Sequence, residues 1–93
     1  MDEFKVVRRH MRFTGRVQGV GFRYRAKYAA KGMGITGWAK NEWDGSVEME
    51  APGTIAQINM MLKMINKSDY IVIDTIDTKD IPLEEHETGF YVR

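Results

Sequence analysis

Apolar and polar residues alternate along several short stretches of the chain and follow a helical spacing in two others. Alternation is typical of a strand with one buried face, and a spacing of three and four residues is typical of a helix with one buried face. In residues 6–15, for example, Met11 and Phe13 share one face with Gly15. The pattern predicts strands at residues 6–15, 35–40, 46–50, 70–76 and 90–93, and helices at residues 22–31 and from Thr54 onward.

Capping signals support both predicted helices. Gly32 and Gly34 follow the last apolar positions of the first helix and are expected to end it. Thr54 and Gln57 form a capping box at the start of the second helix. The predicted buried face of the first helix holds Phe22, Ala26, Ala29 and Ala30, and that of the second holds Ile55, Ile58, Met61, Leu62 and Ile65.

The predicted elements follow the order β-α-β-β-α-β, with a short strand at the end. Residues 41–45 are expected to form a hairpin turn, because Asp44-Gly45 accepts left-handed conformations. This order is typical of the α+β class and of a ferredoxin-like (split βαβ) two-layer sandwich. We expect one domain over residues 1–93: a four- to five-stranded antiparallel or mixed sheet with two helices on one face, preceded by a flexible segment at about residues 1–6.

Composition and charge narrow the possible partners. The chain has 93 residues, 43% of them hydrophobic, which suits one small core. A net charge of +1 gives no reason to expect nucleic acid or a membrane surface as the main partner. The chain has no cysteine, lacks the apolar core of a signal peptide in residues 1–9, and has no run near the roughly 20 apolar residues of a membrane helix. We expect a cytoplasmic monomer.

A glycine-rich loop joins the first strand to the first helix and carries the most informative pattern of the chain. Its sequence is Gly15-Arg16-Val17-Gln18-Gly19-Val20-Gly21-Phe22-Arg23. Glycines let several backbone N–H groups point into one concavity, and a helix N-terminus adds unpaired N–H groups with a partial positive charge. Arg23 adds a planar fork that can hold two phosphate oxygens. The loop therefore predicts a phosphoryl-binding site, although its glycines alone also fit a tight turn.

Two commoner glycine-rich loops do not match this stretch. A P-loop ends in Gly-Lys-Ser/Thr, whereas this loop ends in Gly21-Phe22-Arg23. A dinucleotide fingerprint needs a third glycine three residues after its second, and Tyr24 occupies that position.

Asn41 is a second candidate, at the end of the second predicted strand. A side-chain amide offers both a donor and an acceptor, so it can orient a water molecule. Asparagine also occurs in turns for its backbone tolerance alone. Taken by itself, the residue leaves both interpretations open.

Taken together, two stretches of the chain resemble the signature patterns of the acylphosphatase family. Phe-x-Gly-x-Val-Gln-Gly-Val-x-Phe-Arg is matched from Phe13 to Arg23, and Gly-Trp-Ala-Lys-Asn-x-x-x-Gly-x-Val-x-x-x-x-x-Gly from Gly37 to Gly53. Every fixed position is present, and the length and element order resemble that family over essentially the whole chain. Residues 67–87 depart from the pattern because they lack the Gly-Pro pair often found after the second helix.

The resemblance implies a hydrolase that cleaves the carboxyl–phosphate bond of acyl phosphates, giving a carboxylate and inorganic phosphate. It implies that Arg23 binds the phosphate and that Asn41 positions the attacking water. Inorganic phosphate would be both product and inhibitor. The phosphate cradle would be the backbone of Gly15, Arg16, Val17, Gln18, Gly19, Val20, Gly21 and Phe22.

Such a reaction needs few chemical groups. The leaving carboxylate has a conjugate-acid pKa of about 4–5, so it departs without a general acid. Phosphoryl transfer otherwise depends mainly on positioning and charge stabilisation. The chain offers no compact His/Asp cluster, and we expect neither a cofactor nor a metal ion.

Two other functions fit parts of the sequence. A ferredoxin-like domain can bind RNA on its open sheet face, using aromatic and basic residues. Here that face would hold Arg8, His10, Arg12, Trp38 and Lys40, but Glu48 and Glu50 offset their charge. The chain could also be an acylphosphatase-like domain that acts on carbamoyl phosphate within a larger maturation enzyme; its short length favours a stand-alone protein.

The remaining notable side chains are expected to have ordinary roles. We expect His10 and His86 to be solvated and Met61 to lie in the core, with Met60 and Met64 partly exposed. Trp38 and Trp43 are expected to pack in the core or the turn, although Trp43 could shield the mouth of a site. A solvated edge is expected for Asp74, Asp77, Asp80, Glu84, Glu85 and Glu87.

Overall fold

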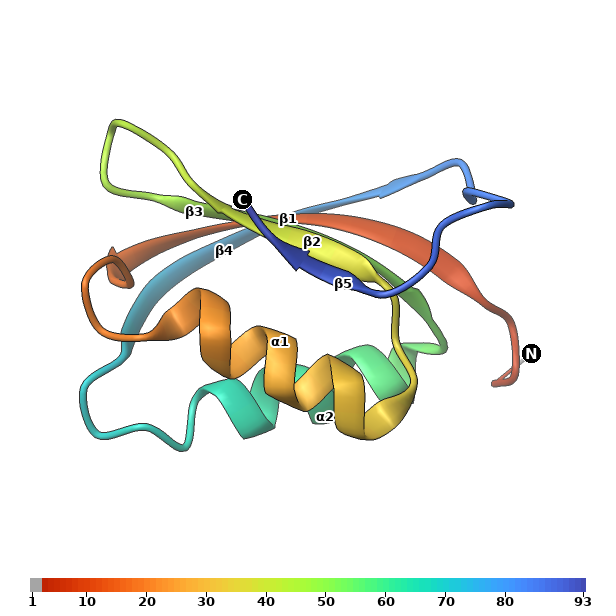
Figure 1. Ribbon diagram of the computed structural model, residues 1–93, viewed down its shortest axis with the longest axis horizontal. Helices are drawn as coiled ribbons and strands as arrows, with labels where there is room; N and C mark the ends of the chain where they lie inside the picture. Colours follow the sequence, from red (N-terminus) through yellow and green to blue (C-terminus); the bar gives the residue numbers. More distant parts are fainter. Residues whose placement is uncertain (1–2) are drawn as a thin grey trace.

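Two helices cover one face of a five-stranded sheet in the computed structural model, which describes residues 3–93 (Figure 1). The predicted flexible segment at residues 1–6 begins outside this range, and the first strand starts at Val7. The elements are β1 (Val7–Arg16), α1 (Phe22–Met33), β2 (Gly37–Asn41), β3 (Val47–Gly53), α2 (Ile55–Ile65), β4 (Val72–Ile81) and β5 (Phe90–Val92).

The sheet has the strand order β4-β1-β3-β2-β5. Neighbouring strands are antiparallel, except that β5 runs parallel to β2. Together with the helices on one face, this mixed sheet confirms the predicted ferredoxin-like α+β fold (Figure 1). The β2–β3 hairpin and the loop that precedes α1 lie at the same end of the molecule, as Figure 1 shows.

The core lies between the sheet and the helices and includes buried residues of β1, β2 and β3. Met11 and Phe13 are fully buried, and the Phe13 and Phe22 rings pack with their centroids 4.8 Å apart. This contact fixes the start of α1 against β1, because aromatic pairs favour such tilted arrangements. Gly15 was predicted on the same face, but it is exposed, at the point where the β1–β4 register shifts between Thr14 and Gly15.

Both helices form where the pattern predicts them, with changes at their ends. The helix α1 continues through Gly32 to Met33, and Gly34 caps it in the left-handed conformation. The capping box of Thr54 and Gln57 is present at the start of α2. Ile55 was predicted to be buried, but it is 45% exposed at the first position of the helix.

The strand β4 is longer than predicted. The sequence indicates residues 70–76, whereas the structure extends β4 to Ile81 along the length of β1. Its acidic residues Asp74, Asp77 and Asp80 were predicted as a solvated edge, and an edge strand tolerates exposed charges because one side of it faces water. Asp80 pairs with Arg9 across the strands at 2.8 Å.

The open face of the sheet carries a network of ion pairs. Arg8 is only 2% exposed and contacts Glu87 at 2.8 Å and Glu50 at 3.2 Å. His10 lies 2.7 Å from Glu50, so it is not the solvated residue that the sequence indicated. Glu87 likewise belongs to this network and not to a solvated edge. Carboxylates therefore neutralise the basic side chains that an RNA-binding surface would need.

Tryptophan positions also differ from the expectation. Trp43 is 99% exposed at the tip of the β2–β3 hairpin and does not pack in the core or the turn. Trp38 is partly buried on the open face, where its ring contacts His10 and Arg93. Met61 is fully buried as predicted, and Met60 is half exposed.

Candidate active site

Arg23 and Asn41 line one cavity of about 290 Å³. Arg23 comes from the first turn of α1, and Asn41 is the last residue of β2. The other residues around the cavity are Val17, Gly19, Gly21, Phe22 and Tyr24. Tyr24 was not among the predicted site residues. It directly follows Arg23 in the first turn of α1, and this position in the sequence could have indicated it.

The N-terminus of α1 has neither a side-chain cap nor an acidic residue, which leaves it bare. Gly19 and Gly21 have φ angles of 71° and 81°, which L side chains rarely adopt. Gly21 is the N-cap, no side chain caps the helix, and no acidic residue stands in the first turn. The first N–H groups of α1 therefore keep their positive partial charge, which favours an anion nearby.

One nitrogen of the Arg23 guanidinium is already held by a hydrogen bond within the protein. Its Nη1 donates a hydrogen bond to the main-chain oxygen of Arg93 at 2.6 Å. The guanidinium of Arg93 in turn lies 4.7 Å from the centre of the Trp38 ring. A guanidinium carries five N–H donors, so this contact uses only part of the capacity of Arg23.

Asn41 carries an unused acceptor. Its Oδ1 atom is buried and has no hydrogen-bond partner among residues 3–93. A buried polar atom without a partner is costly and uncommon, and it marks a place where a bound molecule can complete the hydrogen bonding. The amide therefore lies at the cavity with a free acceptor, at the end of β2.

The Gln18 side chain makes two hydrogen bonds that the sequence did not predict. Its Nε2 donates to the main-chain oxygens of Glu42 and Ser46, the latter at 2.9 Å. Glu42 N–H also donates to Ser46 at 2.8 Å, so this part of the hairpin is a closed hydrogen-bonded unit. Gln18 therefore ties the glycine-rich loop to the strand end that carries Asn41.

The remaining predicted loop residues lie outside the cavity lining. Gly15 and Arg16 are the last residues of β1, and Val20 packs against the core. The cavity thus takes in Val17, Gly19, Gly21 and Phe22 of the predicted cradle and leaves out Gly15, Arg16, Gln18 and Val20.

The hairpin beside Asn41 is held by Asp44. Ser46 donates to Asp44 Oδ1 from its hydroxyl at 2.6 Å and from its main-chain N–H at 2.9 Å, and Arg12 pairs with Oδ2. These hydrogen bonds, the Ser46 hydroxyl foremost, lower the pKa of Asp44 from 3.8 to about 2. Asp44 is therefore ionised at neutral pH and keeps the turn closed.

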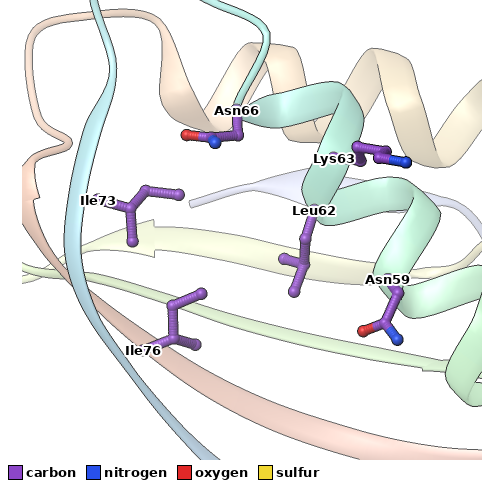
Figure 2. Close-up of a pocket in the computed structure, with 6 residues that line it drawn as sticks. All are labelled: Asn59, Leu62, Lys63, Asn66, Ile73 and Ile76. Carbon is purple, nitrogen blue, oxygen red and sulfur yellow. The ribbon is translucent and has the colours of Figure 1, made fainter.

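A second cavity, of about 350 Å³, lies between α2 and β4 (Figure 2). Leu62, Ile73 and Ile76 point into it, and Asn59, Lys63 and Asn66 complete its lining. Its lining contains neither an arginine nor a glycine-rich loop, so it lacks the features of a phosphoryl site. Within the described part of the chain, no group of three or more acidic or histidine side chains is arranged to hold a metal ion, and no helix is long and apolar enough to cross a membrane.

Comparisons with known proteins identify the family. The acylphosphatase family model matches residues 9–92. An acylphosphatase of Lactobacillus johnsonii is 43% identical over 84 residues, which cover 88% of this chain and 92% of that protein. The chain belongs to the acylphosphatase family.

Solved structures of acylphosphatases share the fold. The crystal structure of acylphosphatase from Bacillus subtilis has a TM-score of 0.83 and 28% sequence identity, covering 94% of this chain and 98% of that one. A second solved structure, the crystal structure of T. kodakarensis HypF, matches with a TM-score of 0.78 and 27% identity, covering 94% of this chain but only 12% of that one. Acylphosphatases are hydrolases, and membership of this family assigns acyl phosphate hydrolysis to the chain.

Proposed function

We propose that the cavity between the glycine-rich loop and Asn41 is the place where this acylphosphatase cleaves its substrate by in-line attack of water on phosphorus. The observation that supports this proposal is that three features surround one cavity. They are Arg23, the bare N-terminus of α1 and the Asn41 Oδ1 atom without a hydrogen-bond partner among the described residues. Cations and N–H groups suit the phosphoryl oxygens, and an amide acceptor suits a water molecule.

Arg23 and the loop bind the phosphoryl group in this mechanism. A cation on the first turn of a helix opposes the helix dipole unless an anion compensates, and the phosphoryl group supplies that anion. The guanidinium N–H groups and the N–H groups at the start of α1 hold the equatorial oxygens as negative charge spreads over them. The hydrogen bond to Arg93 keeps the Arg23 side chain oriented before the substrate arrives.

Asn41 positions the water. Its Oδ1 accepts a hydrogen bond from the water and directs the oxygen lone pair to phosphorus, opposite the acyl oxygen. The water oxygen forms the new bond to phosphorus as the bond between phosphorus and the acyl oxygen breaks. The electron pair leaves with the carboxylate, and a phosphoryl oxygen takes up the water proton. The products are a carboxylate and inorganic phosphate, which can rebind and inhibit.

The same proposal includes the remaining expectations for this protein. It acts as a cytoplasmic monomer and needs no cofactor and no metal ion, because the carboxylate leaving group requires no acid and Arg23 supplies the positive charge. Within the predicted cradle of residues 15–22, the cavity-lining residues Val17, Gly19, Gly21 and Phe22 face the phosphoryl group, and Gln18 contributes by fixing the loop to the hairpin.

Hydrolysis of benzoyl phosphate in the presence of EDTA tests the proposal. The parent protein is expected to turn over, and the Arg23→Ala variant is expected to lose at least about 100-fold in kcat/KM, as removal of one charge-stabilising donor does elsewhere. Arg25→Ala is the matched control, since Arg25 stands on the same helix and donates to Met64. Absence of turnover by the folded parent, or activity that needs added Mg²⁺, would refute the mechanism.

A further inference from the structure

Tyr24 lines the same cavity as Arg23 and Asn41, and its function is not explained by phosphate binding. Its side chain is 56% exposed, whereas the other large apolar side chain of the lining, Phe22, is 1% exposed. Phe22 is therefore committed to the core through its contact with Phe13. Tyr24 is the aromatic residue of the lining whose side chain is exposed and can contact a bound molecule.

The size of the cavity leaves room beyond the phosphoryl group. One water molecule takes up roughly 30 Å³ in the liquid, so a phosphoryl group with its oxygens and an attacking water needs roughly 150 Å³. The cavity measures about 290 Å³. The remaining space is suited to the group attached to the phosphate, which in an acyl phosphate is the acyl group.

An aromatic side chain favours some acyl groups over others. Ring faces and edges attract other planar π systems, in offset or edge-to-face arrangements, by about 0.5–1.5 kcal/mol beyond simple burial. A methyl group next to the carbonyl offers little surface for such a contact. We propose that Tyr24 forms the wall of an acyl-group subsite and gives the enzyme a preference for aromatic acyl phosphates over acetyl phosphate.

This inference rests on the proposed function, and its test compares two substrates on four proteins. The ratio of kcat/KM for benzoyl phosphate to kcat/KM for acetyl phosphate is measured for the parent, Tyr24→Ala, Tyr24→Phe and Tyr28→Ala. Tyr28 is the matched control because it lies one turn further along α1, is 70% exposed, and does not line the cavity. The inhibition constant of inorganic phosphate is measured on each protein, because phosphate carries no acyl group.

We expect Tyr24→Ala to lower the ratio by about two- to tenfold, which is the size of one aromatic contact. Tyr24→Phe keeps the ring and is expected to keep the ratio, and Tyr28→Ala is expected to match the parent. An unchanged ratio in Tyr24→Ala would overturn the subsite. A uniform fall for both substrates with weaker phosphate inhibition would also overturn it, because Tyr24 would then only shape the cradle. If the folded parent hydrolyses neither substrate, the proposed function itself fails.

Discussion

Arg23 donates a hydrogen bond to the main-chain oxygen of Arg93, and the Arg93 side chain stacks over Trp38 on the opposite face of the sheet from the helices. The sequence positions of these residues give no hint of the arrangement, because Arg23 and Arg93 are 70 positions apart. The strand β5 brings them together by pairing beside β2. The orientation of Arg23 therefore depends on a residue outside the cavity.

Replacement of Trp38 tests this dependence. In Trp38→Leu, Arg93 loses the ring beneath its guanidinium, a contact worth about 0.5–1 kcal/mol at exposed sites. We expect KM for benzoyl phosphate to rise about two- to fivefold with little change in kcat, because Arg23 keeps its charge but is held less firmly. The control is Tyr70→Leu, which removes another exposed aromatic side chain away from the cavity. A KM equal to that of the parent would show that the stack does not orient Arg23.

The Asn41→Ala variant separates water positioning from phosphate binding. Loss of the amide is expected to lower kcat by about 100-fold or more, since misplacement of the nucleophile has an effect of that size. The inhibition constant of inorganic phosphate is expected to stay within about twofold of the parent, because phosphate binding does not need the water. Asn59→Ala, on the exposed side of α2, is the control. A loss of phosphate inhibition in Asn41→Ala would contradict the assigned role.

The parts of the fold that depend on nearby residues could be predicted from the sequence. The capping box of Thr54 and Gln57 and the buried positions Phe22 and Ala26 are set within one or two helical turns. Asn41 could be placed at a strand end for the same reason. The motif pattern predicted that Arg23 and Asn41 share one site, and both residues line one cavity.

Features that depend on distant pairing could not be predicted in the same way. Arg8 lies on the polar face of the alternating pattern in the first strand, which is typical of an exposed residue. Only the folded chain brings Glu87, 79 positions away, against it. The length of β4 depends on its pairing with β1, which its own acidic residues obscure. Ile55 fits the periodicity of α2, but the pattern does not show that the first helical turn extends beyond the core.

The ion pair of Arg8 and Glu87 is expected to contribute measurably to stability. Glu87→Gln removes a carboxylate that accepts two hydrogen bonds from Arg8, at 2.8 Å and 3.0 Å, in a partly buried place. We expect the free energy of unfolding at pH 7 to fall by about 1.5–3 kcal/mol, the range for hydrogen bonds to charged groups. Glu85→Gln should change it by less than about 0.5 kcal/mol, because Glu85 is 87% exposed. Urea denaturation of the three proteins measures both effects, and equal losses in the two variants would refute the assignment.

The turn at Asp44 is expected to make stability depend on pH in the acid range. The pKa of Asp44 is lowered from 3.8 to about 2 by hydrogen bonds from Ser46 and Arg12, so the folded state binds the proton less readily than the unfolded state. The resulting stabilisation is complete above about pH 3.8 and is lost as the pH falls through about 2. Asp44→Asn cannot carry this charge, so its deficit in unfolding free energy relative to the parent should shrink steadily between pH 4 and pH 2. Urea denaturation at several pH values in this window measures the deficit, with Asp69→Asn as the control because Asp69 is exposed outside the hairpin. A deficit that is the same at pH 2 and at pH 6 would show that Asp44 acts through its shape and not through its charge.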